Sequence, residues 1–285
     1  MYKIYVDCGH GGAETSTVAT HDGVTLIERD VNLVMANLLT EKLRRLEDVE
    51  VLQSRLTNDL SAPNDMGNFT DSAYRCNLWG TYNNQPVDLM ISIHNNGWRG
   101  TDRGYQIIHS VKQPADLAFL IAEGYDAIGI ARNKIYSRQY SGGMWDSAPG
   151  QLAAPTQEMD YYAIIRETIA NGHTRALIVE TCFLDNREDA LTWIWDIQKG
   201  EYRMDKLEAF MEVILRAIRK FAGLKDKPIY VPPSEPVPEP EPPAEADEMI
   251  FSCSVSVGNG YAVSLVRDRA EGDFDIYQLT VHRAK

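Results

Sequence analysis

The sequence has few cysteines and no long apolar run, and each shortage excludes a class of protein. Its 285 residues include four cysteines, none spaced as Cys-x-x-Cys, so reduced thiols are expected rather than a disulfide framework. No apolar run approaches the roughly 20 residues that a membrane-spanning helix needs. A signal peptide is not expected either, because Lys3 falls within the first predicted strand and no apolar segment with a small-residue cleavage site follows. We therefore expect a protein that is made and held in a cytoplasm, without membrane insertion.

Positive charge is also scarce. The 28 lysines and arginines are outnumbered by 41 aspartates and glutamates, which gives a net charge of −13. Because binding to a phosphate backbone requires a basic surface, nucleic acid is not the expected partner. Apolar residues nevertheless make up 44% of the chain, which is enough to fill the core of one large domain with a small module beside it.

A segment rich in proline and glutamate divides the chain. Residues 228–247 read PIYVPPSEPVPEPEPPAEAD and cannot build a core, so we expect an extended, self-repelling spacer. The predicted organisation is a large domain over residues 1–224, a linker over 225–248 and a small β module over 249–285. The linker has seven acidic residues and two lysines, a net charge of −5, and the module has four residues of each sign. This leaves a net charge of −8 for the large domain.

Apolar strands alternate with amphipathic helices through the large domain. In the helix that begins at Glu28, Val31, Val34 and Leu38 recur on one stripe. Short, uninterrupted apolar strands between helices are typical of a mainly parallel sheet covered on both faces. We therefore predict an α/β fold with a mainly parallel, twisted sheet of about six strands and helices on both faces. The predicted strands are 3–7, 49–55, 88–94, 104–110, 133–138 and 176–180, and the predicted helices are 28–47, 70–83, 114–128, 156–170 and 203–222.

Ionisable residues stand at the ends of three of these strands. His10 follows the first strand within YVDCGHGG, His94 ends DLMISIH, and Glu180 ends ALIVE. In an open α/β sheet, ligands bind at the carboxyl ends of the strands, so these side chains can converge. Glu28, at the start of the first long helix, must lie near the end of a strand that this helix packs against. Two histidines and one carboxylate form a typical zinc site with an open fourth position, beside which a second carboxylate can act as a general base.

Several segments of the sequence resemble the zinc-dependent N-acetylmuramoyl-L-alanine amidases of the type 3 class. These segments are IYVDCGHGG, ERDVNLVMANLL, DLMISIHNN and DYYAIIRET with ALIVETCFLDNREDA, and they occur in the family's order. The resemblance implies that His10, Glu28 and His94 bind Zn²⁺ and that Glu180 is the catalytic glutamate. It also implies that the substrate is bacterial peptidoglycan, cleaved at the amide between N-acetylmuramic acid and L-alanine.

Two cysteines compete with Glu28 as a metal ligand. Cys8 and Cys182 each lie two positions from a candidate site residue, and a thiolate could bind zinc. Packing in the interior is the favoured interpretation for both. The stretch 139–156, QYSGGMWDSAPGQLAAPT, does not align with the family's loop on the substrate side.

Other polar and aromatic residues have simpler interpretations. Arg55 and Arg75 fall where the family has arginines, which we interpret as structural. Asn95 and Asn96 either contact substrate or cap the turn. The aromatic run WIWD over 193–196 favours core packing over a sugar platform. The histidines outside the predicted site are His21, expected to be solvated in the loop THDGVTL, and His109, His173 and His282.

The last residues predict a small antiparallel sheet. FSCSVSV over 251–257 alternates apolar residues with serine, GNG is a turn signal, and YAVSLVRD and FDIYQLTVHR supply two further strands. A three-stranded sheet of this size is marginally stable at best by itself. We therefore expect this module to self-associate, to pair with the catalytic domain or to bind a cell-wall ligand.

A catalytic domain, a proline-rich spacer and a small β module together resemble a phage or prophage endolysin. This resemblance implies a location in the host cytoplasm before release through a separately made membrane pore, and in the cell wall afterwards. Because the catalytic domain is anionic, any targeting to the anionic wall must come from specific contacts of the module. Three alternatives remain open: a zinc carboxypeptidase acting on stem peptides, a lytic amidase of the sporulation mother cell, and a catalytically silent wall-binding protein.

Overall fold

The computed structural model describes residues 1–58, 87–149, 159–169 and 174–227, together with the three strands of the C-terminal module. The chain divides into two compact units, Met1–Ile229 and Tyr230–Lys285, each of which is described by itself. In the described residues, no helix combines the length and the apolar character that a bilayer crossing requires. The predicted helix over 70–83 lies outside the described residues, and so does Arg75.

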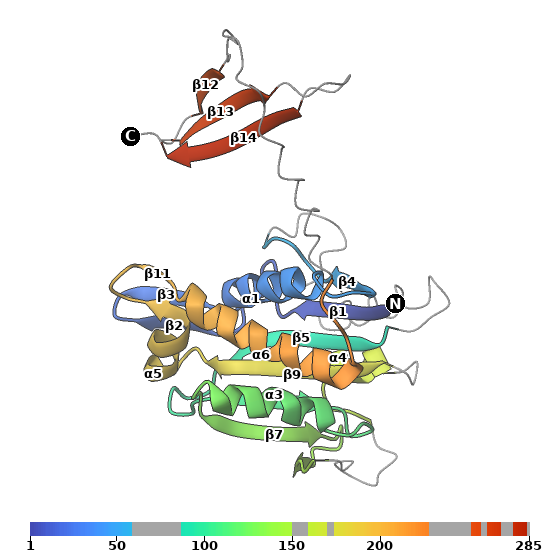
Figure 1. The fold of residues 1–285 in the computed structure, drawn as a ribbon. Coiled ribbons are helices and arrows are strands. Elements are labelled where there is room, and N and C mark those ends of the chain that lie inside the picture. Colours follow the sequence, from blue (N-terminus) through green and yellow to red (C-terminus); the bar gives the residue numbers. More distant parts are fainter. Residues whose placement is uncertain are drawn as a thin grey trace, which may run out of the picture. The chain divides into compact units, whose positions relative to one another are not determined.

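A seven-stranded sheet forms the centre of the first unit (Figure 1). The strand order is β4-β1-β5-β9-β6-β7-β8; β6 is antiparallel to β9 and β8 to β7, whereas the four other pairs are parallel. The predicted α/β fold with a mainly parallel sheet is therefore confirmed. The seventh strand is β8, from a segment for which the sequence analysis predicted no strand. The bounds are β1 Tyr2–Cys8, β4 Val49–Gln53, β5 Leu89–Asn96, β6 Tyr105–His109, β7 Arg132–Arg138, β8 Met144–Asp146 and β9 Arg175–Phe183.

Alternating side chains of the strands pack into two separate cores. In β9, Leu177 and Val179 belong to the core under α1, α3 and α6, whereas Ala176 and Ile178 belong to the core under α4. Figure 1 shows α1, α6 and α3 side by side on the first face of the sheet. Helices on both faces are therefore confirmed. The bounds are α1 Glu28–Leu43, α3 Asp116–Ala127, α4 Ala163–Thr168 and α6 Met204–Ala222.

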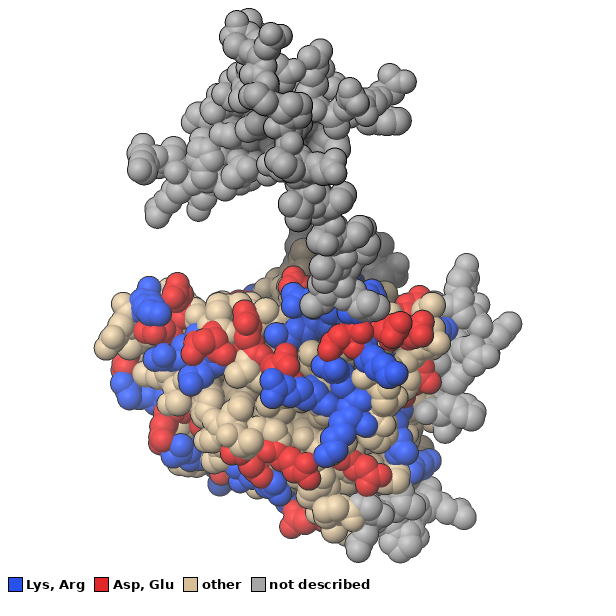
Figure 2. All heavy atoms as spheres, viewed as in Figure 1, with Lys and Arg blue, Asp and Glu red and all other residues tan. Residues whose placement is uncertain are grey.

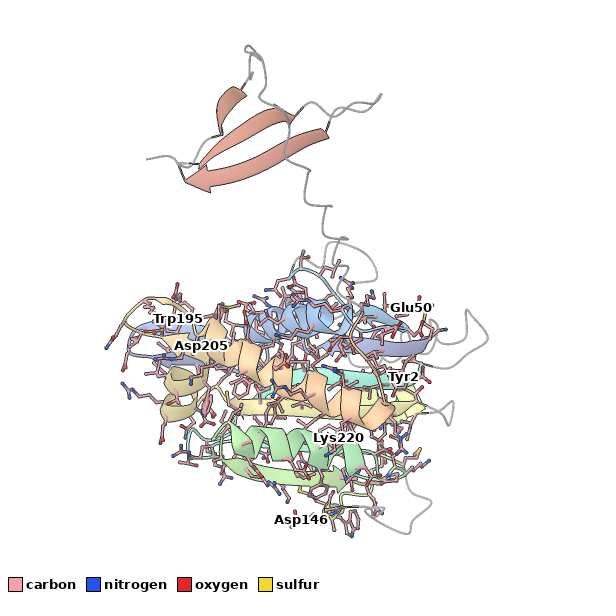
Figure 3. All side chains as sticks on the ribbon, viewed as in Figure 1. Tyr2, Glu50, Asp146, Trp195, Asp205 and Lys220 are labelled. Carbon is pink, nitrogen blue, oxygen red and sulfur yellow. The ribbon has the colours of Figure 1, made fainter. Side chains whose placement is uncertain are left out.

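The amphipathic pattern of α6 explains its position. Leu207, Phe210, Ile214 and Ile218 recur every three or four residues and are fully buried. The helix ends at Gly223, whose φ of 67° is the left-handed conformation that glycine adopts readily. Figure 3 shows α6 lying across the sheet between the labelled Asp205 and Lys220.

The surface over α3 and α6 carries charges of both signs. In Figure 2, lysine and arginine side chains lie among aspartate and glutamate side chains on this face. Ion pairs such as Lys42 with Glu212 and Lys220 with Glu123 connect neighbouring helices there. Side chains of opposite charge are therefore neighbours on the face in view.

The helix α4 is shorter than predicted. The sequence predicted a helix over 156–170, but α4 begins only at Ala163. Asp160 instead forms an isolated bridge with Gln139, and its carboxylate accepts hydrogen bonds from Ser110 Oγ at 2.8 Å and the Val111 amide at 2.7 Å. These tertiary bonds hold residue 160 in an extended conformation, so the helix starts later.

A β-hairpin leads into α1 where the sequence analysis placed a loop. Strands β2 (Val18–His21) and β3 (Val24–Ile27) pair antiparallel through Asp22 and Gly23. The φ angles of these two turn residues are 50° and 85°, as a type I′ turn requires. The hairpin ends directly before Glu28 and so fixes where α1 begins.

Short elements connect β9 to α6. They are α5 (Arg187–Asp189), a π-helix η2 (Ala190–Ile194) and the two-residue strands β10 (Trp195–Asp196) and β11 (Glu201–Tyr202). The Trp193 ring packs on Phe210 of α6 with centroids 5.4 Å apart, which confirms that the run WIWD is a packing element.

The second unit is a three-stranded antiparallel sheet. Its strands are β12 (Ser252–Val257), β13 (Tyr261–Asp268) and β14 (Ile276–Arg283), paired in sequence order. The predicted antiparallel module is therefore confirmed as a sheet.

Candidate metal site

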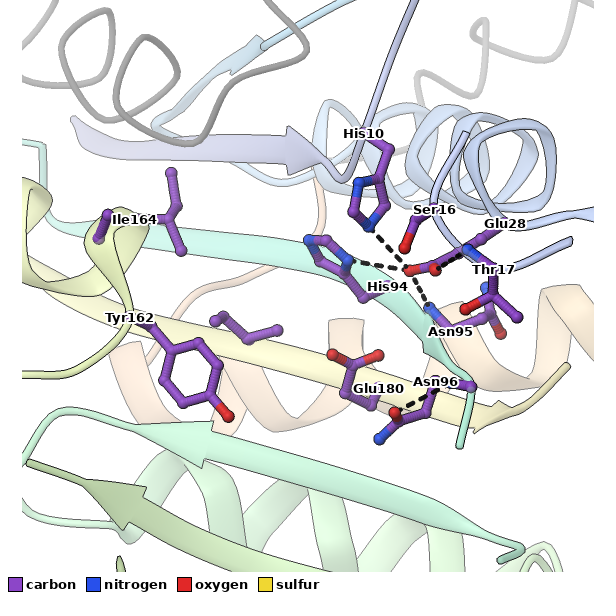
Figure 4. A pocket seen from close by; sticks show the side chains of 13 residues that line it. His10, Ser16, Thr17, Glu28, His94, Asn95, Asn96, Tyr162, Ile164 and Glu180 are labelled. Atoms are coloured by element: carbon purple, nitrogen blue, oxygen red, sulfur yellow. Dashed lines mark hydrogen bonds and ion pairs between the residues drawn. The ribbon is translucent and has the colours of Figure 1, made fainter. Parts of the chain in front are cut away.

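Two histidines and a glutamate meet at the carboxyl ends of β1 and β5 (Figure 4). His10 follows β1, His94 lies in β5, and Glu28 begins α1. His10 Nε2 lies 3.3 Å and His94 Nδ1 lies 3.1 Å from the same Glu28 oxygen, Oε1. One ligand atom from each of the three residues lies within 4.8 Å of the other two. The structure thus brings together all three residues that the sequence analysis proposed as metal ligands.

Arg55 holds the backbone around His10. Its buried guanidinium donates hydrogen bonds to the carbonyls of Cys8 (3.2 Å), Gly9 (3.2 Å), His10 (2.6 Å) and Arg29 (2.7 Å). His10 has a φ of 61°, the left-handed region that costs most residues energy. Arg55 therefore stabilises the turn after β1 and joins it to the first turn of α1, which confirms its structural interpretation.

Gly9 leaves room for the His94 ring. A Cβ atom at position 9 would lie 2.3 Å from Cε1 and Nε2 of His94, far inside van der Waals contact. The backbone amide of Gly9 donates to the Ile93 carbonyl at 3.1 Å, so the two strand ends are fixed against each other. Only glycine lets the turn after β1 approach the histidine of β5 this closely.

A buried polar network holds Glu28 from behind. Glu28 Oε1 accepts from the amide of Asn95 (3.3 Å) and from Asn32 Nδ2 (3.4 Å), and Oε2 accepts from the amide of Thr17 (3.2 Å). Asn95 Nδ2 donates to Asn32 Oδ1 at 2.8 Å, and Thr181 Oγ1 donates to Asn95 Oδ1 at 2.5 Å. The network joins α1, β5 and β9. Asn95 thus supports the site from within, and Asn32 could have been found from its helical i+4 spacing to Glu28.

Glu180 lies beside the three candidate ligands without joining them. It is the register partner of His94 in the neighbouring strand β9, and Figure 4 shows its carboxylate pointing toward His94. Complete burial raises the pKa of Glu180 to about 7; the neighbouring His94 charge lowers it and the Glu28 charge raises it. A carboxylate with this pKa can both accept and release a proton near neutral pH.

The ionisation of the histidine and glutamate pair is coupled. Burial disfavours the charged form of His94, but the hydrogen bond to Glu28 and the charge of Glu180 outweigh it and raise the pKa of His94 to about 9. Burial also acts to raise the pKa of Glu28, yet the hydrogen bonds from His10 and His94 bring it well below its usual range. Glu28 is therefore ionised, and its negative charge favours a cation close to the imidazole rings of His10 and His94.

The site opens into a cavity of about 180 Å³. Tyr162 and Ile164 of the α4 region form its wall opposite Glu28, as Figure 4 shows. The sequence analysis missed these residues because their position depends on where α4 packs. The cavity is lined by His10, Ser16, Thr17, Glu28, His94, Asn95, Asn96, Gly97, Tyr162, Ala163, Ile164, Ile178 and Glu180.

The competing cysteines lie in the interior. Cys8 and Cys182 are free and buried, and burial raises the pKa of both thiols, so neither is a ready thiolate ligand. Among the described residues, the group that could hold a metal consists of the two histidines and Glu28 without a cysteine. The packing interpretation of both cysteines is confirmed.

Of the remaining histidines, the structure describes His21 and His109 in the first unit, and neither belongs to this group. His21 was predicted to be solvated, but the structure corrects this: it ends β2 half-buried, and its Nε2 lies 2.7 Å from the Leu184 carbonyl. The hairpin that the sequence analysis missed brings it there. His109 is buried, with Nε2 2.5 Å from Ser147 Oγ. His173 lies outside the described residues, and His282 lies in β14 of the second unit.

The donor set fits zinc. Two imidazoles and one carboxylate are the ligands of known catalytic zinc sites that keep a fourth position for water or substrate. The amide and hydroxyl network behind Glu28 matches the polar support that metal ligands receive in such sites.

Comparisons with known proteins agree with this geometry. Residues 4–196 match the family model described as N-acetylmuramoyl-L-alanine amidase. A search among curated protein sequences gives no match. Among solved structures, Cwp6 from Clostridium difficile is 21% identical with a TM-score of 0.57, over 77% of this chain and 29% of that one. The catalytic domain of CwlV, an N-acetylmuramoyl-L-alanine amidase from Bacillus (Paenibacillus) polymyxa var. colistinus, is 16% identical with a TM-score of 0.57, over 79% of this chain and 100% of that one.

A further similar structure is the N-acetylmuramoyl-L-alanine amidase AmiC2 of Nostoc punctiforme, 18% identical with a TM-score of 0.53, over 78% of this chain and 97% of that one. At these identities the solved structures establish the shared fold. The family itself is established by the match over residues 4–196, which spans the sheet strands from β1 to β9 and all three candidate ligands. The chain therefore belongs to the N-acetylmuramoyl-L-alanine amidase family.

Proposed function

We propose that this protein is a zinc-dependent hydrolase that cleaves the amide bond between N-acetylmuramic acid and L-alanine in bacterial peptidoglycan. The observation that carries the proposal is the convergence of His10, Glu28 and His94 within 4.8 Å, with the carboxylate of Glu180 on the adjacent strand. Membership of the amidase family supports the same substrate bond.

Amide hydrolysis requires an activated nucleophile and stabilisation of the negative charge that develops on the carbonyl oxygen. When bound by His10, Glu28 and His94, zinc supplies Lewis acidity, which polarises the carbonyl and acidifies water. Glu180 then accepts the proton of the attacking water and passes it to the leaving alanine nitrogen. Its raised pKa favours proton acceptance, because a carboxylate with the usual lower pKa is a weaker base toward water.

The rest of the site orients these groups. The network of Asn32, Asn95 and Thr181 fixes the Glu28 carboxylate toward the histidines. On the opposite side, Tyr162 Oη lies 2.8 Å from Tyr136 Oη, which fixes one wall of the cavity. Such fixed walls hold a substrate amide in one orientation relative to Glu180.

The biological role that we propose is that of an endolysin of a phage or prophage. In this role the catalytic domain 1–224 acts on the cell wall after release from the host cytoplasm, and the module 249–285 follows a linker over 225–248. The proline- and glutamate-rich composition of the linker and the separate three-stranded sheet support this organisation. A mother-cell lytic amidase of a sporulating bacterium would have the same parts.

Product analysis tests the proposed reaction. Purified peptidoglycan is digested with the full-length protein, with and without a chelator, and new amino termini and reducing sugars are measured. An amidase releases alanine amino termini, leaves the reducing sugars unchanged and stops when the metal is removed. Release of reducing ends would indicate a glycosidase, release of carboxy-terminal amino acids a carboxypeptidase, and no product a wall-binding protein, and each result would contradict the proposal.

A further inference from the structure

A row of cationic and aromatic side chains continues from the wall of the cavity. Tyr136 of β7 packs in the same core as Ile178 of β9, so it lies on the cavity face of the sheet. Because side chains alternate along a strand, Lys134 and Arg138 lie on this face too. Tyr136 contacts the cavity residue Tyr162 through their hydroxyl groups, 2.8 Å apart. β7 thus extends the substrate side of the molecule beyond Glu180.

Beyond β7 the chain pairs with the segment that precedes α4. Gln139 bridges Asp160, and the Tyr161 amide donates to the Arg138 carbonyl at 2.9 Å. Within this ribbon, Gln139 and Asp160 point inward with exposed fractions of 3% and 2%, whereas Tyr140 and Tyr161 point outward with 61% and 41%. Alternation therefore places two exposed aromatic rings on one side of a ribbon whose other side is anchored in the protein.

The Arg138 guanidinium lies on one of these rings without a carboxylate partner. Its Cζ is 3.6 Å from the centroid of the Tyr161 ring. In the part of the chain that the structure describes, no carboxylate lies within ion-pair distance of Arg138, whereas Arg132 pairs with Asp126. The arginine guanidinium is planar and can bind a carboxylate through two parallel hydrogen bonds.

The pair of Arg138 and Tyr161 adjoins the cavity. The rings of Tyr161 and Tyr162 are in edge contact, with centroids 5.3 Å apart, and Tyr162 lines the cavity. Arg138 lies two strands across the sheet from Glu180 and four residues along β7 from the position in register with it. These two offsets correspond to roughly 16 Å between the Cα atoms of Arg138 and Glu180. An extended peptide spans that distance in about four or five residues.

We propose that Arg138, stacked on Tyr161, binds a carboxylate of the peptidoglycan stem peptide beyond its first residue. The proposal rests on the proposed function, which places the bond before L-alanine at Glu180. The stem peptide is the part of this substrate that combines an extended chain with several free carboxylates. In a domain with a net charge of −8, an arginine without an acidic partner among the described residues is one of the groups that can attract such an anion, and Arg138 is the one in contact with the cavity wall through Tyr161 and Tyr162.

The test separates binding from catalysis. The Glu180→Gln protein is loaded with zinc and titrated calorimetrically with an N-acetylmuramoyl pentapeptide whose carboxyl groups are free, and with the same compound carrying carboxamides. A charge-assisted bidentate contact should make the free form bind about tenfold or more tightly. Adding Arg138→Gln should bring both affinities to the level of the amidated compound, and Arg138→Lys should restore part of the difference.

Arg216→Gln is the matched control. Arg216 is an exposed arginine of α6 on the other face of the sheet, paired with Glu212, and its loss should leave the affinity ratio unchanged. Equal affinities before any arginine is changed, a ratio that survives Arg138→Gln, or no binding of either compound would overturn the subsite. A protein that prefers the free form through Arg138 but releases no alanine amino terminus from peptidoglycan when Glu180 is intact would overturn the amidase reaction instead.

Discussion

The ring of His10 stands nearly perpendicular to the ring of His94, with centroids 4.8 Å apart and an interplanar angle of 84°. This orientation directs Nε2 of His10 and Nδ1 of His94 to the same oxygen of Glu28. Three ligand atoms from separate parts of the chain thus face one point, with Glu180 on the next strand. Without a metal ion, a proton on His94 balances the Glu28 charge, and a divalent cation would replace it.

Loss of one imidazole should abolish tight metal binding. Replacing His94 with alanine should weaken Zn²⁺ binding more than about 100-fold, because changes in the residues that merely support a metal ligand already cost 10- to 100-fold. Competition with a chromogenic chelator measures the Kd. His21→Ala is the control, since His21 lies outside the cluster and should leave the Kd unchanged. A His94→Ala protein with the original affinity would refute the assigned ligand.

Replacement of the proposed base should affect the rate and spare the metal. Glu180→Gln should lower kcat for peptidoglycan by about 10² to 10⁴, with Zn²⁺ affinity changed by less than about threefold. The exposed Glu188, which pairs with Arg103, offers a control, and Glu188→Gln should keep the original kcat. If Glu180→Gln lost its zinc and its activity together, Glu180 would be a ligand instead of a base.

Removal of the metal should make stability depend on pH. The folded state raises the pKa of His94 from 6.5 to about 9, so the stability that its proton contributes is fully present below pH 6.5 and is lost as the pH rises through 9. Glu180, with its pKa raised to about 7, adds a loss of stability between about pH 4.5 and 7. We expect the Tm of chelator-treated protein to fall by about 5 °C or more between pH 6.5 and 9.

Scanning calorimetry of the zinc-loaded protein provides the comparison. Zinc displaces the proton from His94, so the Tm of the loaded protein should vary little over the same range. A chelator-treated protein whose Tm stayed constant from pH 6.5 to 9 would show that His94 carries no such proton.

The close approach of Gly9 to His94 predicts a specific defect. Gly9→Ala would place a methyl group 2.3 Å from the ring atoms, so the ring must move and Zn²⁺ affinity should fall about tenfold or more. Gly129→Ala is a control for destabilisation alone: its φ of 87° disfavours alanine, but the added methyl group meets nothing within 4 Å. The control should melt earlier and bind zinc normally. Equal zinc affinities for both variants would contradict the argument.

The C-terminal module should determine the association state. Because a three-stranded sheet of this size is marginal by itself, we expect the full-length chain to self-associate and a chain ending at residue 224 to be monomeric. Sedimentation velocity over a range of concentrations measures both. Identical monomers would exclude self-association and leave a cell-wall ligand or the catalytic domain as partner of the module.

Elements with strong local patterns could be predicted from the sequence. The apolar strands β1, β5 and β9 and the amphipathic helices α1 and α6 lie where their periodicity placed them. The helix α4 and the hairpin β2–β3 did not follow prediction. Hydrogen bonds of Asp160 to residues about 50 positions away shorten α4, and the turn of the hairpin is formed by Asp22 and Gly23, an Asp-Gly pair typical of type I′ turns.

The sequence by itself determined which residues stand at the strand ends, because burial of alternating apolar residues fixes a strand locally and leaves His10, His94 and Glu180 just beyond the core. Only the tertiary structure decided how they face one another. The hydrogen bonds of Arg55 to four carbonyls and those of Asn95 to Asn32 and Thr181 join residues far apart in the chain. Such contacts form when the strands pair, and no local pattern encodes them, because their energy depends on distances that exist only in the folded chain.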